Sequence, residues 1–253
     1  HASYLSGGID SSALAYFLSR NQSGQKLQTF SLGFESKDYD ETEAQMEMAN
    51  FLKVDHNFVK IRNHDISSHF RQSVEHAETV LFRTAPIPMF LLSKKVRELG
   101  HKVVFTGEGA DEVLLGYDLF SEARVRCFWS RQPDSKIRPL LLQRLYNYLP
   151  QFRNSRYFAI VKDFYRSNLT DTTNVFYSHL VRWAQFKQVS AYFNIAENIS
   201  EEKLISALLE SFPLEFQSMS LDRRAQILEY ETLLHGYLLS SQGDRMSMAH
   251  GLE

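Results

Sequence analysis

The sequence predicts an α/β fold, in which a parallel, doubly wound sheet is followed by a mostly helical second half. Two observations lead to this prediction. Over the first hundred residues, short apolar stretches alternate with segments of helical periodicity, and this alternation is typical of a parallel sheet with right-handed crossovers. From about Glu122 onward, glycines become few, aromatic residues become many, and apolar residues recur at helical spacing, which favours packed helices.

Each element follows from its local pattern. A short apolar strand over residues 2–5 precedes a helix that begins near Asp10, and an apolar stripe indicates that this helix is amphipathic. The stripe consists of Ile9, Ala13, Tyr16 and Phe17. Acidic residues open a helix over Thr42–Leu52, because carboxylates stabilise helix N-termini. The other expected elements of the first half are strands over 27–34 (ending at Gly33), 56–61 and 102–106, and helices over 66–77 and 88–99.

In the second half, helical spacing predicts a helix through Leu140, Leu141, Leu145 and Tyr148, and two prolines predict a loop over 131–139.

Composition narrows the class of protein. The 253 residues are 43% hydrophobic, enough for one large domain or two small ones. The formal net charge is −2 and the basic residues are dispersed, so the basic patch of a nucleic-acid-binding protein is missing. A single cysteine, Cys127, excludes an internal disulfide and a thiolate metal cage and fits a reducing compartment. No apolar run is long enough to cross a bilayer. We therefore expect a cytoplasmic protein with neither nucleic acid nor membrane as partner.

The stretch YLSGGIDSS, residues 4–12, has the composition of an anion site. A glycine pair directly after a strand lets several backbone N–H groups converge, and the following helix adds its positive end. Ser6, Ser11 and Ser12 supply further donors, but no lysine follows as in the common phosphate loop of kinases. Asp10 would repel phosphate unless a divalent cation lay between them, which points to Mg²⁺. The alternative is an ordinary turn in which Asp10 only caps the helix.

A second stretch, FTGEGADEVLLGYDLF at 105–120, again joins glycines and carboxylates after a strand. Glu108, Asp111 and Glu112 fall within one turn. Ligands of doubly wound sheets bind at the carboxyl ends of the strands, where both stretches and Gly33 are expected to lie. The sequence therefore predicts a pocket formed by three loops. The alternative is that these carboxylates are only favourable first-turn charges.

Together these residues resemble the synthetase domain of glutamine-dependent asparagine synthetases, members of the ATP pyrophosphatase superfamily with an adenine nucleotide alpha hydrolase-like fold. The resemblance rests on SGGIDSS at 6–12, FSLGF at 30–34 and GEGADE at 107–112 followed by Gly116 and Tyr117. It extends to YDETEAQ at 39–45, PMFLLSKK at 88–95 and SSQGDRMSMAHGLE at 240–253. It implies one synthetase domain with an ATP pyrophosphatase core over 1–120 and a helical portion over 121–253. We expect the chain to be a fragment, because it begins without Met and shows no end signal after Glu253.

The resemblance also implies roles for individual residues. The loop of residues 6–12 would hold the β- and γ-phosphates of ATP, and Asp10 and Asp111 would hold Mg²⁺. Glu108 matches a glutamate associated with forming the β-aspartyl-adenylate, so Glu108, Asp10 and Asp111 are the expected catalytic residues. Adenosine would lie against Tyr4, Leu32, Thr106 and Gly107. The full set of expected nucleotide-binding residues is Tyr4, Leu5, Ser6, Gly7, Gly8, Asp10, Ser11, Ser12, Leu32, Gly33, Thr106 and Gly107.

The activity implied is ATP-dependent amide synthesis through an acyl-adenylate, with release of AMP and pyrophosphate. Asparagine from aspartate is favoured, with ammonia delivered by a glutaminase partner domain. Where many family members have an aspartate and a serine, this chain reads LFRTAPIP at 81–88. This departure places Arg83 and Thr84 near the expected acceptor site and leaves the acceptor carboxylate open. The alternatives are an enzyme that forms a β-lactam or amidates a peptide or sugar acid, and a non-catalytic ATP-binding module.

Three further assignments stay open in the sequence. Arg245 either touches substrate or forms a surface ion pair. His64, His69 and His76 lack the spacing of a helical zinc pair and are interpreted as ordinary polar residues. The oligomeric state is not fixed, and a homodimer stays open.

Overall fold

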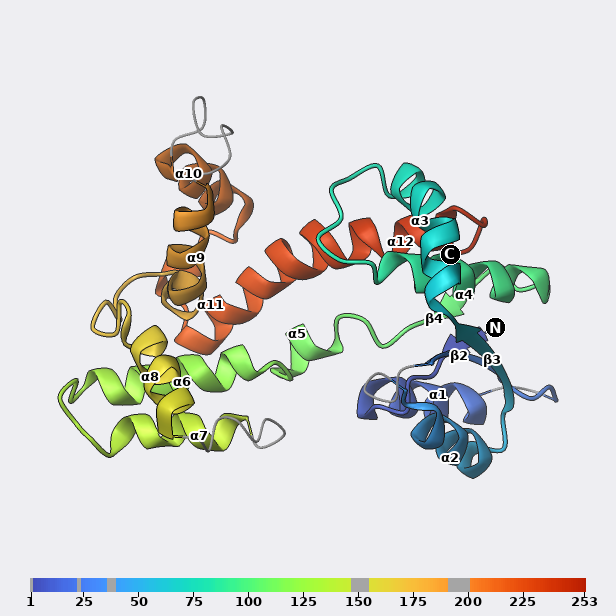
Figure 1. Ribbon diagram of the computed structural model, residues 1–253, viewed down its shortest axis with the longest axis horizontal. Helices are drawn as coiled ribbons and strands as arrows, with labels where there is room; N and C mark the ends of the chain where they lie inside the picture. Colours follow the sequence, from blue (N-terminus) through green and yellow to red (C-terminus); the bar gives the residue numbers. More distant parts are fainter. Residues whose placement is uncertain (1, 22–23, 36–39, 147–154, 191–200) are drawn as a thin grey trace. The chain divides into compact units, whose positions relative to one another are not determined.

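The computed structural model describes residues 2–21, 24–35, 40–146, 155–190 and 201–253 (Figure 1). The chain forms two compact units. The first unit contains residues 1–110 and 232–253, and the second contains residues 111–231. This division differs from the predicted split at residue 120, because the end of the chain belongs to the unit that holds the sheet.

The first unit is built on four parallel strands. These are β1 (Ala2–Tyr4), β2 (Gln28–Phe34), β3 (Asp55–Ile61) and β4 (Val104–Phe105), in the spatial order β3-β2-β1-β4. The predicted parallel, doubly wound sheet is thus confirmed. The chain passes from β1 to β2 and β3 on one side and reaches β4 on the other. The boundary between β1 and β4 is therefore the switch point of the sheet, where ligands of such folds bind.

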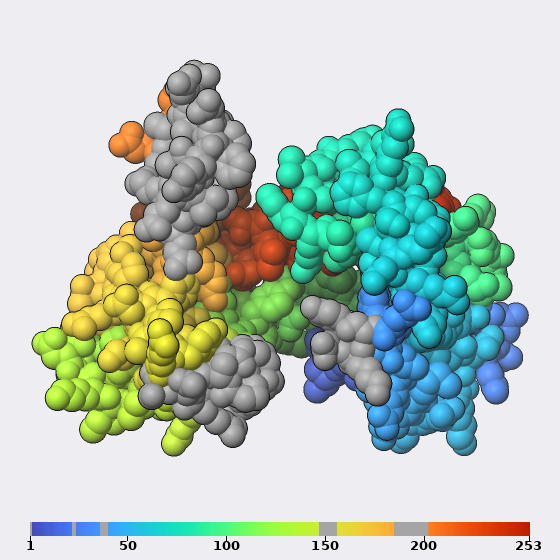
Figure 2. All heavy atoms as spheres, in the orientation of Figure 1, coloured from blue at the N-terminus to red at the C-terminus, as the bar shows by residue number. Residues whose placement is uncertain are grey.

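Helices cover both faces of this sheet (Figure 1). The helices of the first unit are α1 (Ile9–Arg20), α2 (Thr42–Leu52), α3 (Asn63–Ala77), α4 (Pro86–Glu98) and α12 (Asp244–Met248). On one face, Leu5 and Leu27 pack with Ala15 of α1 and Ala49 of α2. On the other, apolar residues of the strands pack with α4; this cluster includes Tyr4, Phe30, Leu92 and Val96. In Figure 2, segments of α2 and α3 form much of the visible surface of this unit.

Two helices begin earlier than expected, and one strand is shorter than expected. Helix α3 begins three residues early, because Asp65 accepts a hydrogen bond from the Arg62 N–H at 2.9 Å and closes the first turn. Helix α4 begins at Pro86, since proline suits the first helical position. Strand β4 covers only two residues of the predicted five.

The apolar stripe of α1 is the clearest departure. Ile9 is 83% exposed and Phe17 is 63% exposed, whereas Ser11, Ser12 and Ala15 are buried. The small polar face of α1 packs on the sheet because Ser11 forms hydrogen bonds with Ser6 in the loop that follows β1. An amphipathic pattern was therefore a poor guide to the face that this helix buries.

The end of the chain completes the first unit. The Glu253 N–H donates to the Lys102 carbonyl, and the Val104 N–H donates to the Glu253 carbonyl, both at 2.8 Å. Glu253 therefore continues the ladder beyond β4. Leu252 is buried in the cluster that contains Tyr4, and the Ser93 hydroxyl donates to the Met246 carbonyl at 2.7 Å.

In its described residues the second unit contains helices joined by turns and loops and no strand, as predicted. Its elements are α5 (Ala110–Leu114), α6 (Asp118–Ser130), η1 (Arg138–Leu141), α7 (Leu142–Leu145), α8 (Ser155–Arg166), α9 (Tyr177–Ser190), α10 (Glu201–Ser211), η4 (Phe216–Ser218) and α11 (Leu221–Leu228); the π-helix η5 (Glu229–Leu239) follows and continues into the first unit. The predicted loop over 131–139 ends in a 3-10 helix at Arg138. Leu140, Leu141 and Leu145 are helical as expected, and Tyr148 lies outside the described residues.

The core of the second unit combines apolar packing with paired charges. Trp129, Leu142 and Val181 are nearly inaccessible to solvent. Among them lies Arg126, 1% exposed, which donates to the carbonyls of Tyr165, Ser167 and Tyr177. Through these three hydrogen bonds, Arg126 of α6 joins the end of α8, the loop that follows it and the start of α9.

Among the helices of the described residues, none combines the length and the hydropathy that crossing a bilayer requires.

Candidate functional site

The loop after β1 requires glycine at its first turn. The Leu5 N–H donates to the Phe30 carbonyl at 2.9 Å and extends the ladder one residue past β1. Gly7 then has φ +82°, a conformation that other residues rarely adopt. A Cβ at Gly7 would lie 2.9 Å from Ala44 Cβ and 3.0 Å from the Gln45 nitrogen. Both its conformation and the close approach of α2 therefore demand glycine.

Hydroxyl groups fix the rest of this loop. The Ser6 and Ser11 Oγ atoms lie 2.8 Å apart, and the Gly8 N–H donates to Ser6 Oγ at 3.2 Å. Gly8 precedes α1 and provides no side-chain cap, so the first-turn N–H groups of α1 are not satisfied by the helix or by its N-cap side chain. Ser12 is 7% exposed, and its Oγ finds no partner within the described chain. These donors at a positive helix end suit an anion.

The loop after β4 lies directly against the start of α1. A Cβ at Gly107 would lie 3.2 Å from the Ser11 nitrogen and 3.5 Å from Asp10 Cβ. The loop is held by a hydrogen bond from the Glu108 N–H to Thr106 Oγ1 at 3.0 Å and by one from the Ala110 N–H to the Gly107 carbonyl at 3.2 Å. The structure thus brings Asp10, Ser11 and Gly107 together, as the sequence predicted for two of its three loops.

Asp111 and Glu112 belong to the second unit. A Cβ at Gly116 would collide with the Asp111 carboxylate, and the Gly116 N–H donates to the Asp111 carbonyl at 2.8 Å. Glu112 is 1% exposed and accepts a hydrogen bond from the Tyr117 hydroxyl at 2.9 Å. Asp111 therefore has a defined local setting, and its pairing with Asp10 around one metal ion stays a prediction.

Gly33 has a different role from the one expected of a loop residue. It lies inside β2, where it pairs with Lys60 of β3, so the strand does not end there. A Cβ at Gly33 would collide with the ring of Phe58. Packing against this ring explains the glycine without a ligand, and binding of nucleotide by Gly33 stays a prediction.

Residues 1–253 match the family model described as asparagine synthase. The chain belongs to the asparagine synthase family. It is 34% identical over 148 residues to asparagine synthetase [glutamine-hydrolyzing] 2 of Oryza sativa subsp. japonica, covering 54% of this chain and 25% of the relative. It is 36% identical over 129 residues to asparagine synthetase [glutamine-hydrolyzing] 1 of Lotus japonicus, covering 47% and 22%. The chain thus spans about a quarter of the length of the curated relatives it matches.

Tyr4 and Leu32 are two of the expected nucleotide-binding residues, and hydrogen bonding and burial define the surroundings of both. Tyr4 is 9% exposed, and burial raises its pKa to about 12, an effect that the nearby Ser247 hydroxyl moderates. The Leu32 carbonyl accepts a hydrogen bond from Gln45 Nε2 at 3.0 Å. Gln45 was not among the expected site residues, although a glutamine within an otherwise apolar helix face was a usable signal.

The LFRTAPIP segment at 81–88 contacts residues 237–242 through Arg83. Arg83 donates to Gln242 Oε1 at 3.1 Å and lies 5.8 Å from the ring centre of Tyr237. Arg245 forms an ion pair with Glu78 at 2.8 Å, as one of its two interpretations predicted. Contact of Arg83 or Arg245 with substrate stays a prediction.

Three histidines of the first unit, His56, His69 and His76, have structural partners. His56 lies between Thr29 and Ser31 of β2, with 2.9 Å from each ring nitrogen to one hydroxyl. His69 and His76 lie beside the Phe90 ring. Within the described residues, no group of three or more His, Cys, Asp or Glu side chains could hold a metal ion.

Proposed function

We propose that this chain is the ATP-dependent portion of an enzyme that makes asparagine from aspartate, and that both units belong to one synthetase domain. One observation carries the proposal: the contact of Gly107 with Ser11 places the loop after β4 against the loop after β1. These loops meet at the switch point of the sheet, where nucleotides bind in related folds. Family membership supports the same conclusion.

The chain's residues fit a triphosphate. The unpartnered hydroxyl of Ser12 and the first-turn N–H groups of α1 supply donors, and the missing side chain at Gly107 leaves room beside them. Adenosine would lie along Leu32, Thr106 and Gly107. Asp10 in the first turn of α1 would hold Mg²⁺ together with phosphate oxygens, and we propose Asp111 as its second carboxylate; Mg²⁺ commonly accepts one or two carboxylates in this way.

The reaction would proceed in two steps. A carboxylate oxygen of aspartate attacks the α-phosphorus of ATP, the bond to the bridging oxygen breaks, and pyrophosphate leaves. Ammonia then attacks the acyl carbon, and AMP leaves. Backbone N–H groups and the α1 terminus would favour the transition state, because negative charge accumulates on the departing pyrophosphate. Bound Mg²⁺ would neutralise part of that charge.

Glu108 is proposed to act on the nitrogen nucleophile. Its carboxylate can orient an amine or accept a proton from it. It follows Gly107 directly, and its backbone is fixed by Thr106. The ammonia would come from glutamine through a glutaminase domain of the full-length protein, as the names of the relatives suggest, and we propose the cytoplasm as the location.

The proposal is tested with the full-length protein supplied with ATP, Mg²⁺, aspartate and ammonium. Pyrophosphate and asparagine should form in equal amounts, and Asp10→Asn should abolish both while leaving the protein folded. Pyrophosphate formed with another carboxylate but not with aspartate would redirect the acceptor. Tight ATP binding without pyrophosphate under any of these conditions would contradict an enzymatic role.

A further inference from the structure

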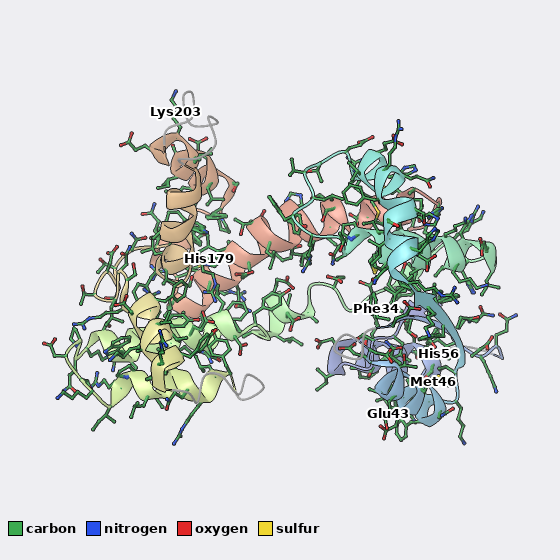
Figure 3. The ribbon with its side chains drawn as sticks, in the orientation of Figure 1. Phe34, Glu43, Met46, His56, His179 and Lys203 are labelled. Atoms are coloured by element: carbon green, nitrogen blue, oxygen red, sulfur yellow. The ribbon has the colours of Figure 1, made fainter. Side chains whose placement is uncertain are left out.

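We propose that Gln45 is a positioning residue, which holds the end of β2 in place for the nucleoside part of ATP. The inference rests on the proposed function, since it assumes that ATP binds at these loops. Gln45 lies on α2 and is 3% exposed. Figure 3 marks its surroundings, with Phe34 at the end of β2 and Glu43 and Met46 on α2.

Gln45 donates a hydrogen bond to β2 at the point where the backbone hydrogen bonds from β1 have ended. The Phe30 carbonyl accepts a hydrogen bond from the Leu5 N–H, which is the last bond from β1 to β2. Carbonyls two residues apart in a strand point the same way, so the Leu32 carbonyl, like that of Phe30, points toward the β1 side of β2. At this level the chain that follows β1 has already turned into the loop. Gln45 Nε2 donates to that carbonyl at 3.0 Å. A side chain from α2 therefore replaces the missing backbone donor.

The same residue also touches the phosphate loop. The Gln45 nitrogen would lie 3.0 Å from a Cβ placed on Gly7, so its backbone lies against the loop at its tightest turn. Gln45 thus contacts the loop through its backbone and the end of β2 through its side chain. It sets the distance between the expected phosphate and adenosine positions.

The orientation of the amide is determined by its partner. Only the NH₂ group can donate to the Leu32 carbonyl, so Oε1 must point elsewhere. Within the described chain this oxygen is buried and finds no donor. A buried acceptor without a donor destabilises a fold, so the side chain does not serve stability alone.

The test compares two glutamines of the first unit. Gln28 lies at the opposite end of β2, where its Oε1 is 2.8 Å from His101 Nε2. Gln45→Met and Gln28→Met each remove one side-chain hydrogen bond while keeping length. Equilibrium dissociation constants for Mg²⁺–ATP and for Mg²⁺–tripolyphosphate, which lacks the nucleoside, are measured on the full-length protein by titration calorimetry.

Gln45→Met should raise the Kd for ATP about tenfold, the equivalent of one lost hydrogen bond, and should change the Kd for tripolyphosphate less than twofold. Gln28→Met should change neither. Gln45→Leu also removes the donor, so it should repeat the effect if Gln45→Met does not fold. An unchanged ATP affinity, or an equal loss for both ligands, would overturn the inference. Failure of the unmodified protein to bind ATP would instead overturn the proposed function.

Discussion

In the second unit, buried charged side chains form bonds with one another or with backbone carbonyls, whereas the first unit holds most of the buried polar side-chain atoms that have no partner among the described residues. Arg126 donates to three carbonyls, and Glu122 binds Arg182 at 2.6 Å. Of the nine buried side-chain atoms without a partner among the described residues, six lie in the first unit. Ser12 and Gln45 are two of the residues concerned. The difference indicates that buried polar side chains join helices in the second unit, whereas the first unit keeps unpartnered polar atoms, among them the Ser12 hydroxyl in α1.

The largest effect is expected from Arg126→Met. Three carbonyls would lose a hydrogen bond from the guanidinium, and a hydrogen bond to a charged group contributes about 1.5–3 kcal/mol. The free energy of unfolding should therefore fall by about 3 kcal/mol or more, as measured by urea denaturation.

Arg124→Ala on the same helix is the matched control. Its ion pair with Asp222 at 2.9 Å is about half exposed, so the loss should be about 1 kcal/mol or less. Similar losses for both variants would show that the second unit does not depend on buried pairing.

A second prediction concerns the contact between the two loops. Gly107→Val would press a branched side chain on the Ser11 nitrogen, so ATP affinity should fall about 100-fold, or roughly 2.7 kcal/mol, in a binding titration. Gly100→Ala is the control. Gly100 has φ +86° with nothing within 4 Å of a Cβ, so this change should lower stability without changing ATP affinity. Equal ATP affinity for all three proteins would contradict the site.

A third prediction separates packing from binding at Gly33. Gly33→Ala should lower the free energy of unfolding by about 1–3 kcal/mol, because the new methyl group collides with the Phe58 ring. Adding Phe58→Ala should recover part of this loss in a double-mutant cycle. If the two changes were simply additive, the packing explanation would be wrong.

The smallest effect is a dependence of stability on pH in the first unit. Burial is the main cause that lowers the pKa values of His56, His101 and His250 below that of an unfolded histidine, which is about 6.5. Just below pH 6.5 these histidines bind protons in the unfolded chain, whereas in the folded first unit they remain neutral. Stability should therefore be complete above pH 6.5 and decline as the pH falls toward the lowered values.

Thermal unfolding followed from pH 7.5 to pH 5 would measure this decline. His56→Gln removes one of the three groups and should make the curve shallower. An unfolding midpoint that rose on acidification would contradict the assigned direction.

Much of the first unit could be predicted from sequence because its signals are local. Strand and helix periods gave the order of elements, and glycine followed by carboxylate located the two loops that meet at Ser11 and Gly107. Other features depend on residues far apart in the chain. The exposed stripe of α1 depends on Ser11 facing its loop, and the glycine at position 33 depends on Phe58 in the neighbouring strand. Gln45 and Arg126 act on carbonyls that no sequence period indicates.

A crystal structure of the protein with a non-hydrolysable ATP analogue and Mg²⁺ would test the proposed nucleotide site most directly. Phosphate oxygens should lie within hydrogen-bond distance of the first-turn N–H groups of α1 and of Ser12 Oγ, with the nucleoside beside Leu32 and Gly107. A nucleotide bound elsewhere, with these donors unoccupied, would contradict it.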